Sequence, residues 1–265
     1  MSTNNNNLQI PGLSGLRVAV TAGAGGIGLE IARSLHEHGA RLAISDIDKK
    51  ALAAAEQELT DCITATADVS DETSVDAFFN LIQSELGGID ALINNAGIAG
   101  PTGKVFEIPP ADWRRCIDVC LTGQYLCARR AVPMMIAAGG GALVNMSSAA
   151  GKHGYAYRTP YSAAKFGVIG LTQSLAKELG PDNIRVNAIL PGIVDGPRMD
   201  SVIKDRAQAS GKSFETMRDE YLNKISMRRM VSSKDVAATV AFLLSDAGHN
   251  ISGQSLAVDG NVETL

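Results

Sequence analysis

A glycine-rich turn near the start of the chain separates a predicted strand from a predicted helix. Residues 16–21 form a short, valine-rich apolar run typical of a buried strand, and a helical pattern follows the turn as far as His38. Three glycines of the turn have the spacing G-x-G-x-x-G, which lets the backbone bend tightly and approach a pyrophosphate at the positive N-terminus of a helix. Alone, such a turn is often only a turn, so its meaning depends on the rest of the chain. The residues concerned are Gly23, Gly25, Gly26, Ile27 and Gly28.

Strands and helices alternate along the whole chain. Long helices are expected over residues 111–137 and 157–179, and strands are expected to begin near residues 16, 41, 61, 89, 141, 183 and 254. This alternation predicts a parallel sheet of about seven strands with helices on both faces, a doubly wound, Rossmann-type α/β fold. A chain of 265 residues suits one such domain, expected over residues 14–265. Its ligand should bind beyond the carboxyl ends of the strands.

The second predicted strand ends in an acidic residue. Asp46 lies eighteen residues after Gly28, where a carboxylate can accept hydrogen bonds from the ribose of an adenosine. The alternative is that Asp46 caps the helix that begins near Lys49. A 2′-phosphate beside Asp46 would bring like charges together, and no lysine or arginine in residues 22–25 or at Ile47 offsets them. The sequence therefore predicts NAD rather than NADP as the cofactor.

A serine, a tyrosine and a lysine have a spacing that suits proton transfer. Tyr161 and Lys165 lie four residues apart in a predicted helix and share one face, and Ser148 lies thirteen residues before the tyrosine. An ammonium group near a phenol favours the phenolate, which allows a tyrosine to pass protons near neutral pH. Because a tyrosine and a lysine four apart usually have no such role, the pattern gains weight only from the motifs around it.

Together, these motifs resemble those of the short-chain dehydrogenase/reductase family. The resemblance covers residues 16–260, and it implies that Ser148 polarises the substrate oxygen and that Tyr161 is the acid/base. It also implies that Lys165 favours the phenolate and holds the nicotinamide ribose. The motifs follow the family order: the glycine turn, Asp68-Val69, Asn94-Asn95-Ala96-Gly97, Ser148, Tyr161 with Lys165, and Pro191-Gly192.

The same resemblance implies the rest of an NAD site and an assembly. Asp46 would select NAD, and Asp68 and Val69 would bracket the adenine. Similar proteins are usually homotetramers joined through the two long helices and the C-terminal segment. The apolar residues on several faces of the predicted helix 157–179 agree with such burial. The cofactor cleft would be lined by Asn95, Ala96, Gly97, Pro191, Gly192, Ile193 and Val194.

Three positions depart from the family pattern. Ala22 replaces the first glycine of the usual turn T-G-x-x-x-G-x-G; because alanine carries a Cβ, we expect a negative φ there, with Gly23 supplying the flexibility. Cys120 replaces an asparagine whose backbone carbonyl holds a relay water in the family, so the sequence does not decide whether this proton relay is kept. Gly196 replaces a threonine that contacts the nicotinamide amide, so backbone groups at 193–194 would carry more of that role.

No strand is predicted between residues 191 and 236. Apolar residues instead recur at helical spacing after a break at Ser210-Gly211. We expect this segment, about residues 195–230, to form a small helical lid over the substrate, as in the family; an amphipathic helix that only packs on the domain is the alternative. The apolar residues are Phe214, Met217, Tyr221 and Ile225.

The same region and the segment before Tyr161 hold the few clues to the substrate. Arg158 and Arg198 are able to bind a carboxylate in bidentate fashion, which would suit an acidic or hydroxy-acid substrate; surface ion pairs are the alternative. His153 fits a loop or a pocket wall better than a catalytic role. Three methionines either line an apolar pocket or pack in the core: Met199, Met217 and Met227.

Composition excludes several classes of protein. A net charge of −4 argues against nucleic-acid binding, and no apolar run approaches the roughly 20 residues that span a bilayer. The four cysteines include no CxxC pair and the four histidines are scattered, so we expect reduced, buried thiols and no metal site. Residues 1–13 are expected to form a disordered polar tail rather than a signal peptide, in a cytoplasmic protein.

We therefore predict an NAD(H)-dependent enzyme acting on CH–OH donors, which interconverts a secondary alcohol and a ketone by hydride transfer at nicotinamide C4. Two alternatives remain. One is a non-enzymatic NAD-binding sensor that kept the fold, which Cys120 leaves open. The other is an epimerase or dehydratase of a nucleotide sugar, against which the short C-terminal part and Pro191-Gly192 argue.

Overall fold

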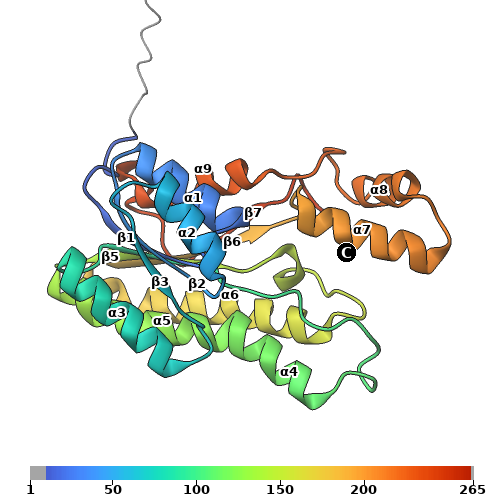
Figure 1. The fold of residues 1–265 in the computed structure, drawn as a ribbon, viewed down its shortest axis with the longest axis horizontal. Coiled ribbons are helices and arrows are strands. Elements are labelled where there is room, and N and C mark those ends of the chain that lie inside the picture. Colours follow the sequence, from blue (N-terminus) through green and yellow to red (C-terminus); the bar gives the residue numbers. More distant parts are fainter. Residues whose placement is uncertain (1–9, 264–265) are drawn as a thin grey trace, which may run out of the picture.

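The computed structural model describes residues 10–263, which contain a parallel sheet of seven strands (Figure 1). The strands are paired in the order β3-β2-β1-β4-β5-β6-β7, and every neighbouring pair is parallel. The predicted doubly wound α/β fold is confirmed. The strands are β1 Arg17–Thr21, β2 Arg41–Asp46, β3 Ile63–Thr66, β4 Ala91–Asn94, β5 Gly141–Met146, β6 Ile184–Pro191 and β7 Ser255–Val258.

Helices cover both faces of this sheet. Alternate residues of β1 show the two layers: Val18 and Val20 pack with α1, α2 and α9, whereas Ala19 packs with α3 and α5 on the opposite face, which α6 also covers (Figure 1). Both faces are apolar because both are buried. These helices are α1 Gly26–Glu37, α2 Lys49–Glu58, α3 Glu72–Leu86, α5 Gly123–Ala137, α6 Thr159–Leu179 and α9 Ser233–Leu244.

Local signals set the ends of individual helices. The carboxylate of Asp71 accepts a hydrogen bond of 3.0 Å from the backbone N–H of Thr73 and so caps the start of α3. Gly87 ends the same helix with a left-handed φ of 72°. The long helix predicted over residues 111–137 consists of α4 Pro110–Ile117, a π-helical turn Asp118–Thr122, and α5.

The order of the strands places a crevice at the carboxyl end of β1. The chain leaves β1 toward β2 on one side, and β4 pairs on the other, so the direction of winding reverses there. Connections at such a reversal diverge to opposite faces of the sheet and leave room for a ligand. The glycine turn after Thr21 and the segment after Asn94 both open onto this crevice.

Two helices follow β6 at one end of the sheet (Figure 1). They are α7 Pro197–Ser210 and α8 Phe214–Leu222, separated at Gly211, which has a left-handed φ of 64°. They share a small apolar core of their own, which includes Ile203, Met217 and Tyr221. The helical pattern and the break predicted for this segment are therefore present.

The folded domain begins earlier than predicted. Leu13, placed in the expected tail, is fully buried in the core beneath α1 and α9, and Ile10 packs against the same cluster. Burial of these two apolar side chains holds residues 10–13 to the domain, while residues 1–9 of the predicted tail lie outside the described residues. Within residues 10–263, no helix has both the length and the apolar character needed to cross a membrane.

Candidate active site

A cavity of about 490 Å³ lies at the carboxyl ends of the strands, between the sheet and the α7–α8 segment. Its size suits a small-molecule ligand. Most of the predicted site residues lie on its wall, whereas Gly23, Gly28, Asp68, Val69 and Ala96 do not. The predicted residues that line it are Gly25, Gly26, Ile27, Asp46, Asn95, Gly97, Ser148, Tyr161, Lys165, Pro191, Gly192, Ile193 and Val194.

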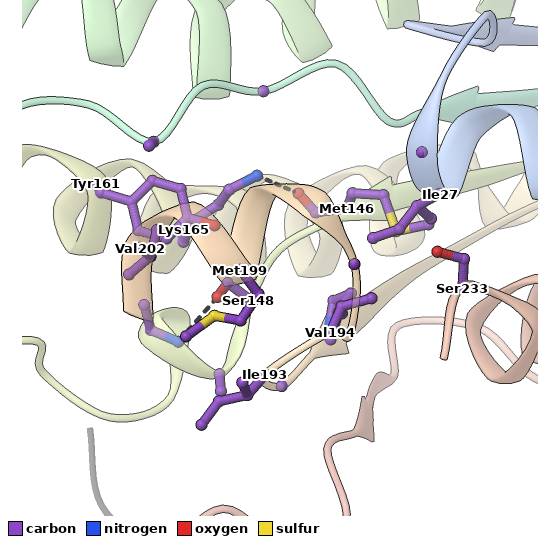
Figure 2. A pocket seen from close by; sticks show the side chains of 18 of the residues that line it. Ile27, Met146, Ser148, Tyr161, Lys165, Ile193, Val194, Met199, Val202 and Ser233 are labelled. Atoms are coloured by element: carbon purple, nitrogen blue, oxygen red, sulfur yellow. Dashed lines mark hydrogen bonds between the residues drawn. The ribbon is translucent and has the colours of Figure 1, made fainter. Parts of the chain in front are cut away.

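Ser148, Tyr161 and Lys165 meet at this cavity (Figure 2). Ser148 follows β5, and its Oγ accepts a hydrogen bond of 3.1 Å from the backbone N–H of Ala150. Tyr161 and Lys165 lie one turn apart on α6, and the Lys165 ammonium is 5.7 Å from the centre of the Tyr161 ring. A hydrogen bond of 2.7 Å from Lys165 Nζ to the Met146 carbonyl, drawn in Figure 2, holds this buried ammonium in place. The three side chains can therefore act on one bound molecule.

The glycine turn is packed too closely for other residues at two positions. A Cβ added to Gly28 would lie 2.1 Å from the Ala22 carbonyl oxygen, and one added to Gly23 would lie 2.8 Å from Cβ of Ile44. By contrast, Cβ atoms at Gly25 and Gly26 would meet nothing within 4 Å, because these residues face the cavity. No side chain caps the N-terminus of α1, and its first turn carries no acid. This arrangement fits the pyrophosphate of a dinucleotide.

The backbone at Ala22 differs from the prediction. Ala22 has a positive φ of 49°, and Gly23 does not. The side-chain amide of Asn95 donates hydrogen bonds of 3.0 Å to the carbonyls of Thr21 and Ala22, which holds the chain in this conformation. The flexibility of glycine was thus assigned to the wrong residue: Gly23 is needed for close packing, and Ala22 is strained.

We expect Ala22→Gly to stabilise the protein by about 0.5 kcal/mol. The substitution removes the strain of an alanine in the left-handed conformation, and this gain in free energy exceeds the cost of the greater conformational entropy that glycine gives to the unfolded chain. The difference in stability is measured by thermal unfolding of both proteins without NADH. Ala24→Gly is the matched control, since Ala24 is buried and has no positive φ, and it should destabilise the protein instead. A lower unfolding temperature for Ala22→Gly would contradict the strain at Ala22.

Asp46 lies at the cavity and does not cap α2. Its Oδ2 accepts a hydrogen bond of 3.3 Å from the backbone of Ala24, and its Oδ1 accepts one of 3.1 Å from Asp48. The cap of α2 is Asp48, whose carboxylate accepts from the backbone N–H groups of Lys50 and Ala51. The alternative that Asp46 caps the helix is therefore wrong, because Asp48 is the cap. Asp46 instead lies beside the glycine turn, where it lines the cavity.

The residues predicted to bracket an adenine lie beyond the cavity wall. Asp68 forms an ion pair of 3.0 Å with Arg115 and accepts hydrogen bonds from Ser70. Burial acts to raise the pKa of Asp68, but the bonds from Ser70 and Arg115 prevail and hold it below its ordinary value. Val69 packs against Gly123, where an added Cβ would lie 2.7 Å from a methyl group of the valine.

Cys120 lies in the π-helical turn beside the site. Its Sγ is 3.4 Å from both the backbone nitrogen and the carbonyl oxygen of Ile98, within hydrogen-bonding distance for sulfur. Its carbonyl accepts a bond of 3.3 Å from the side-chain amide of Gln124, which also donates to the Met146 carbonyl. The four cysteines are buried, and burial raises the pKa of Cys62 and Cys127 to about 12, as expected of unreactive thiols.

Of the other residues predicted near the substrate, some line the cavity and others do not. Arg158 and Met199 line the cavity, and Met199 faces it with Val202 from α7 (Figure 2). Met217 packs in the α7–α8 core, Met227 is exposed, and His153 lies off the cavity wall. The side chain of Arg198 lies outside the described residues.

Several residues at or beside the cavity were not singled out from the sequence. The Met146 carbonyl that holds Lys165 is a backbone group, so no residue type signals it. Thr21 Oγ1 accepts bonds of 3.0 Å from the backbone N–H groups of Asn95 and Ala96, and its place at the end of β1 is the one signal that pointed to it. Lys224 lines the cavity and lies between Tyr221 and Ile225 of the predicted apolar pattern, to which it does not itself belong.

Comparison with known proteins agrees with the fold. A family model described as enoyl-(acyl carrier protein) reductase matches residues 21–262. The chain belongs to the short-chain dehydrogenase/reductase family, and it is an oxidoreductase of that family that acts on alcohol or ketone substrates with a nicotinamide cofactor.

Individual relatives are similar over nearly their whole length. Cis-4-hydroxycyclohexanecarboxylate dehydrogenase of Sinomonas cyclohexanicum is 40% identical over 250 residues, 92% of this chain and 95% of its own. A 2-dehydro-3-deoxy-L-rhamnonate dehydrogenase (NAD(+)) of Sphingomonas sp. (strain SKA58) is 36% identical over 86% of this chain and 87% of its own. The crystal structure of an actinorhodin polyketide ketoreductase variant with NADPH superimposes with a TM-score of 0.90 at 30% identity, covering 97% of this chain and all of that one.

Proposed function

We propose that this protein is an NAD(H)-dependent oxidoreductase that interconverts a secondary alcohol and a ketone through Ser148, Tyr161 and Lys165. The observation that carries the proposal is the meeting of these side chains in one cavity with the glycine turn. A fixed proton-transfer group beside a nucleotide site is what hydride transfer from an alcohol requires. The relatives named as dehydrogenases support the same reaction.

In the oxidation direction, the Tyr161 phenolate takes the proton of the substrate hydroxyl as the C=O bond forms. NAD⁺, when bound, supplies the acceptor for the hydride that leaves the carbinol carbon. Because Ser148 Oγ already accepts a bond from Ala150, its own proton is available to the substrate oxygen. The buried ammonium of Lys165 lies near the phenol and is placed to offset negative charge on its oxygen during the transfer.

The residues of the turn and of the neighbouring loops fit the cofactor. Backbone N–H groups at Gly25 and Gly26 would bind the pyrophosphate, and Asp46 would accept hydrogen bonds from the adenosine ribose. Asp46 would also disfavour a 2′-phosphate, and the Sphingomonas relative is named for NAD(+). The remaining cofactor contacts would come from Asp68 and Val69 at the adenine, and from residues 95–97 and 191–194 along the cleft.

The proposed enzyme works in the cytoplasm as a homotetramer. Support for the assembly lies on α6, where Phe166 remains 47% exposed although the helix is apolar on several faces, and on α9, where Phe242 is 40% exposed. Light scattering of the purified protein measures the assembly, and a monomer would contradict this proposal.

The reaction is tested by cofactor reduction over a panel of secondary alcohols, sugars and hydroxy acids, each run with NAD and with NADP. We expect turnover with NAD by at least one member, with release of free NADH. Retention of NADH through turnover would instead indicate an epimerase or dehydratase. Tight NADH binding with no turnover of any member would favour the sensor, and Cys120 would be the next residue to exchange.

A further inference from the structure

The substrate end of the cavity carries positive charge that the described carboxylates leave unpaired. Arg158 and Lys224 line this cavity, and Arg206 lines a second cavity of about 250 Å³ that shares Tyr221 and Lys224 with the first. None of these three cations forms an ion pair with any carboxylate whose side chain is described. They are therefore available to a charged ligand.

The described acids at the two cavities do not balance these cations. Glu220 lines the second cavity, but it forms an ion pair with Lys212, which also lines it. Asp46 lies beside the glycine turn, where it contacts the backbone of Ala24. Asp195 also lines the cavity, but Arg218 lies 3.6 Å from its carboxylate. The described wall near Arg158 thus has an excess of positive charge.

Arg158 lies directly against the reacting group. Its guanidinium carbon is 5.0 Å from the ring centre of Tyr161 and 5.3 Å from that of Tyr155. One nitrogen, Nη2, donates to the carbonyl of Ala99, while Nε is buried without a partner in the described structure. A backbone carbonyl does not neutralise a guanidinium, and a half-buried cation without a counter-ion is costly. A ligand carboxylate beside Arg158 would offset that cost within reach of Tyr161.

A line of contacts extends this charge into the lid segment. The Tyr155 ring stacks on Arg158, and burial, with Tyr221 next to it, raises the pKa of Tyr155. The Tyr221 hydroxyl accepts a bond of 3.1 Å from Arg206, and its ring centre lies 5.3 Å from the Lys224 ammonium. These contacts add no carboxylate to the line, so they supply no counter-ion for its cations.

Two explanations fit the stacked arginine. Arg158 could serve only to hold the loop before α6 through its contacts with two tyrosines. That role would not explain why a further cation lies at the same end of the cavity. It would also not explain why a buried donor of Arg158 has no partner in the described structure. We propose that the cavity accepts an anionic substrate, a hydroxy- or oxo-carboxylate whose carboxylate lies against Arg158. This inference rests on the proposed oxidoreductase function and names its substrate class.

The test compares acids with their neutral esters. Initial rates of NAD reduction are measured with 2-hydroxybutanoate, 3-hydroxybutanoate, 4-hydroxypentanoate and 5-hydroxyhexanoate, each beside its methyl ester. For the chain length that fits, we expect the acid to exceed its ester in kcat/KM by roughly 10- to 100-fold, the range of a hydrogen bond between charged groups. Arg158→Met should abolish that preference mainly through KM, and Arg158→Lys should restore part of it. Lys177→Met, an exposed charge removed at the far end of α6, should leave the preference unchanged.

A binding measurement separates this inference from the reaction. The catalytically disabled Tyr161→Phe protein, saturated with NADH, is titrated with the same acids and esters by calorimetry, and Lys224→Met provides a second charge variant in case Arg158→Met does not fold. Saturable binding of an acid but not its ester, weakened by Lys224→Met, supports the inference even if no turnover occurs. Turnover of acids and esters with equal kcat/KM would overturn it and leave the proposed reaction intact. Absence of both binding and turnover for every acid would also overturn it.

Discussion

Replacing Tyr161 by phenylalanine is expected to lower kcat by about 100- to 10,000-fold, the usual contribution of general acid–base catalysis. The change removes the phenol oxygen that takes the substrate proton. It keeps the aromatic ring, and with it the contact of 5.0 Å with the Arg158 guanidinium, so the cavity should keep its shape. NADH binding, followed by fluorescence titration, should change less than twofold because Lys165 and the glycine turn remain.

Tyr157→Phe is the matched control for this experiment. Tyr157 lies four residues before Tyr161, its side chain is 53% exposed, and it does not line the cavity. This variant should keep the activity of the unaltered enzyme. Activity of Tyr161→Phe within a factor of three of the control would remove Tyr161 from its proposed role, and the sensor or a different acid/base would have to be considered.

Replacing Asp46 by alanine is expected to raise the ratio of kcat/KM for NADP to that for NAD by about one to three decades. The reason is electrostatic: a carboxylate and a 2′-phosphate about 4 Å apart repel by roughly 1–4 kcal/mol, depending on the effective dielectric constant. Alanine also removes the acceptor for the ribose hydroxyls, so the kcat/KM for NAD should fall. The two ratios are measured with the same alcohol under one ionic strength, since salt screens exposed charges.

Asp48→Ala separates this effect from a general loss of charge. Asp48 lies two residues further on and caps α2 through the backbone N–H groups of Lys50 and Ala51. Its removal should cost about 1 kcal/mol of stability without altering the cofactor ratio. If Asp46→Ala leaves the ratio unchanged, or if Asp48→Ala changes it as strongly, repulsion by Asp46 does not explain the choice of cofactor.

Much of the fold could be predicted from residue patterns because those patterns are local. Apolar runs and glycine or polar breaks mark strands and helices, and strict alternation of the two leaves a parallel sheet as the consistent arrangement. The strand starts expected near residues 41 and 141 agree with β2 and β5. The break between α7 and α8 could be predicted for the same reason, since glycine after a helical run commonly ends the helix, as Gly211 does.

The candidate site was predictable where its geometry follows from the chain itself. Tyr161 and Lys165 share a helix face whatever packs around them, and Ser148 follows β5, whose carboxyl end opens on the crevice. Proximity of a carboxylate to the glycine turn likewise follows from β2 pairing beside β1, which places Asp46 next to the turn.

Only the tertiary structure decided the rest. It assigned the positive φ to Ala22 through the amide of Asn95, buried Leu13 in the core, and placed Arg158 between Tyr155 and Tyr161. These features depend on contacts between segments far apart in the chain, and many packings are compatible with the same local pattern. The sequence by itself therefore determined the class of fold and the grouping of Ser148, Tyr161 and Lys165, while the charge and shape of the cavity came from how the α7–α8 segment, the loop before α6 and the sheet pack together.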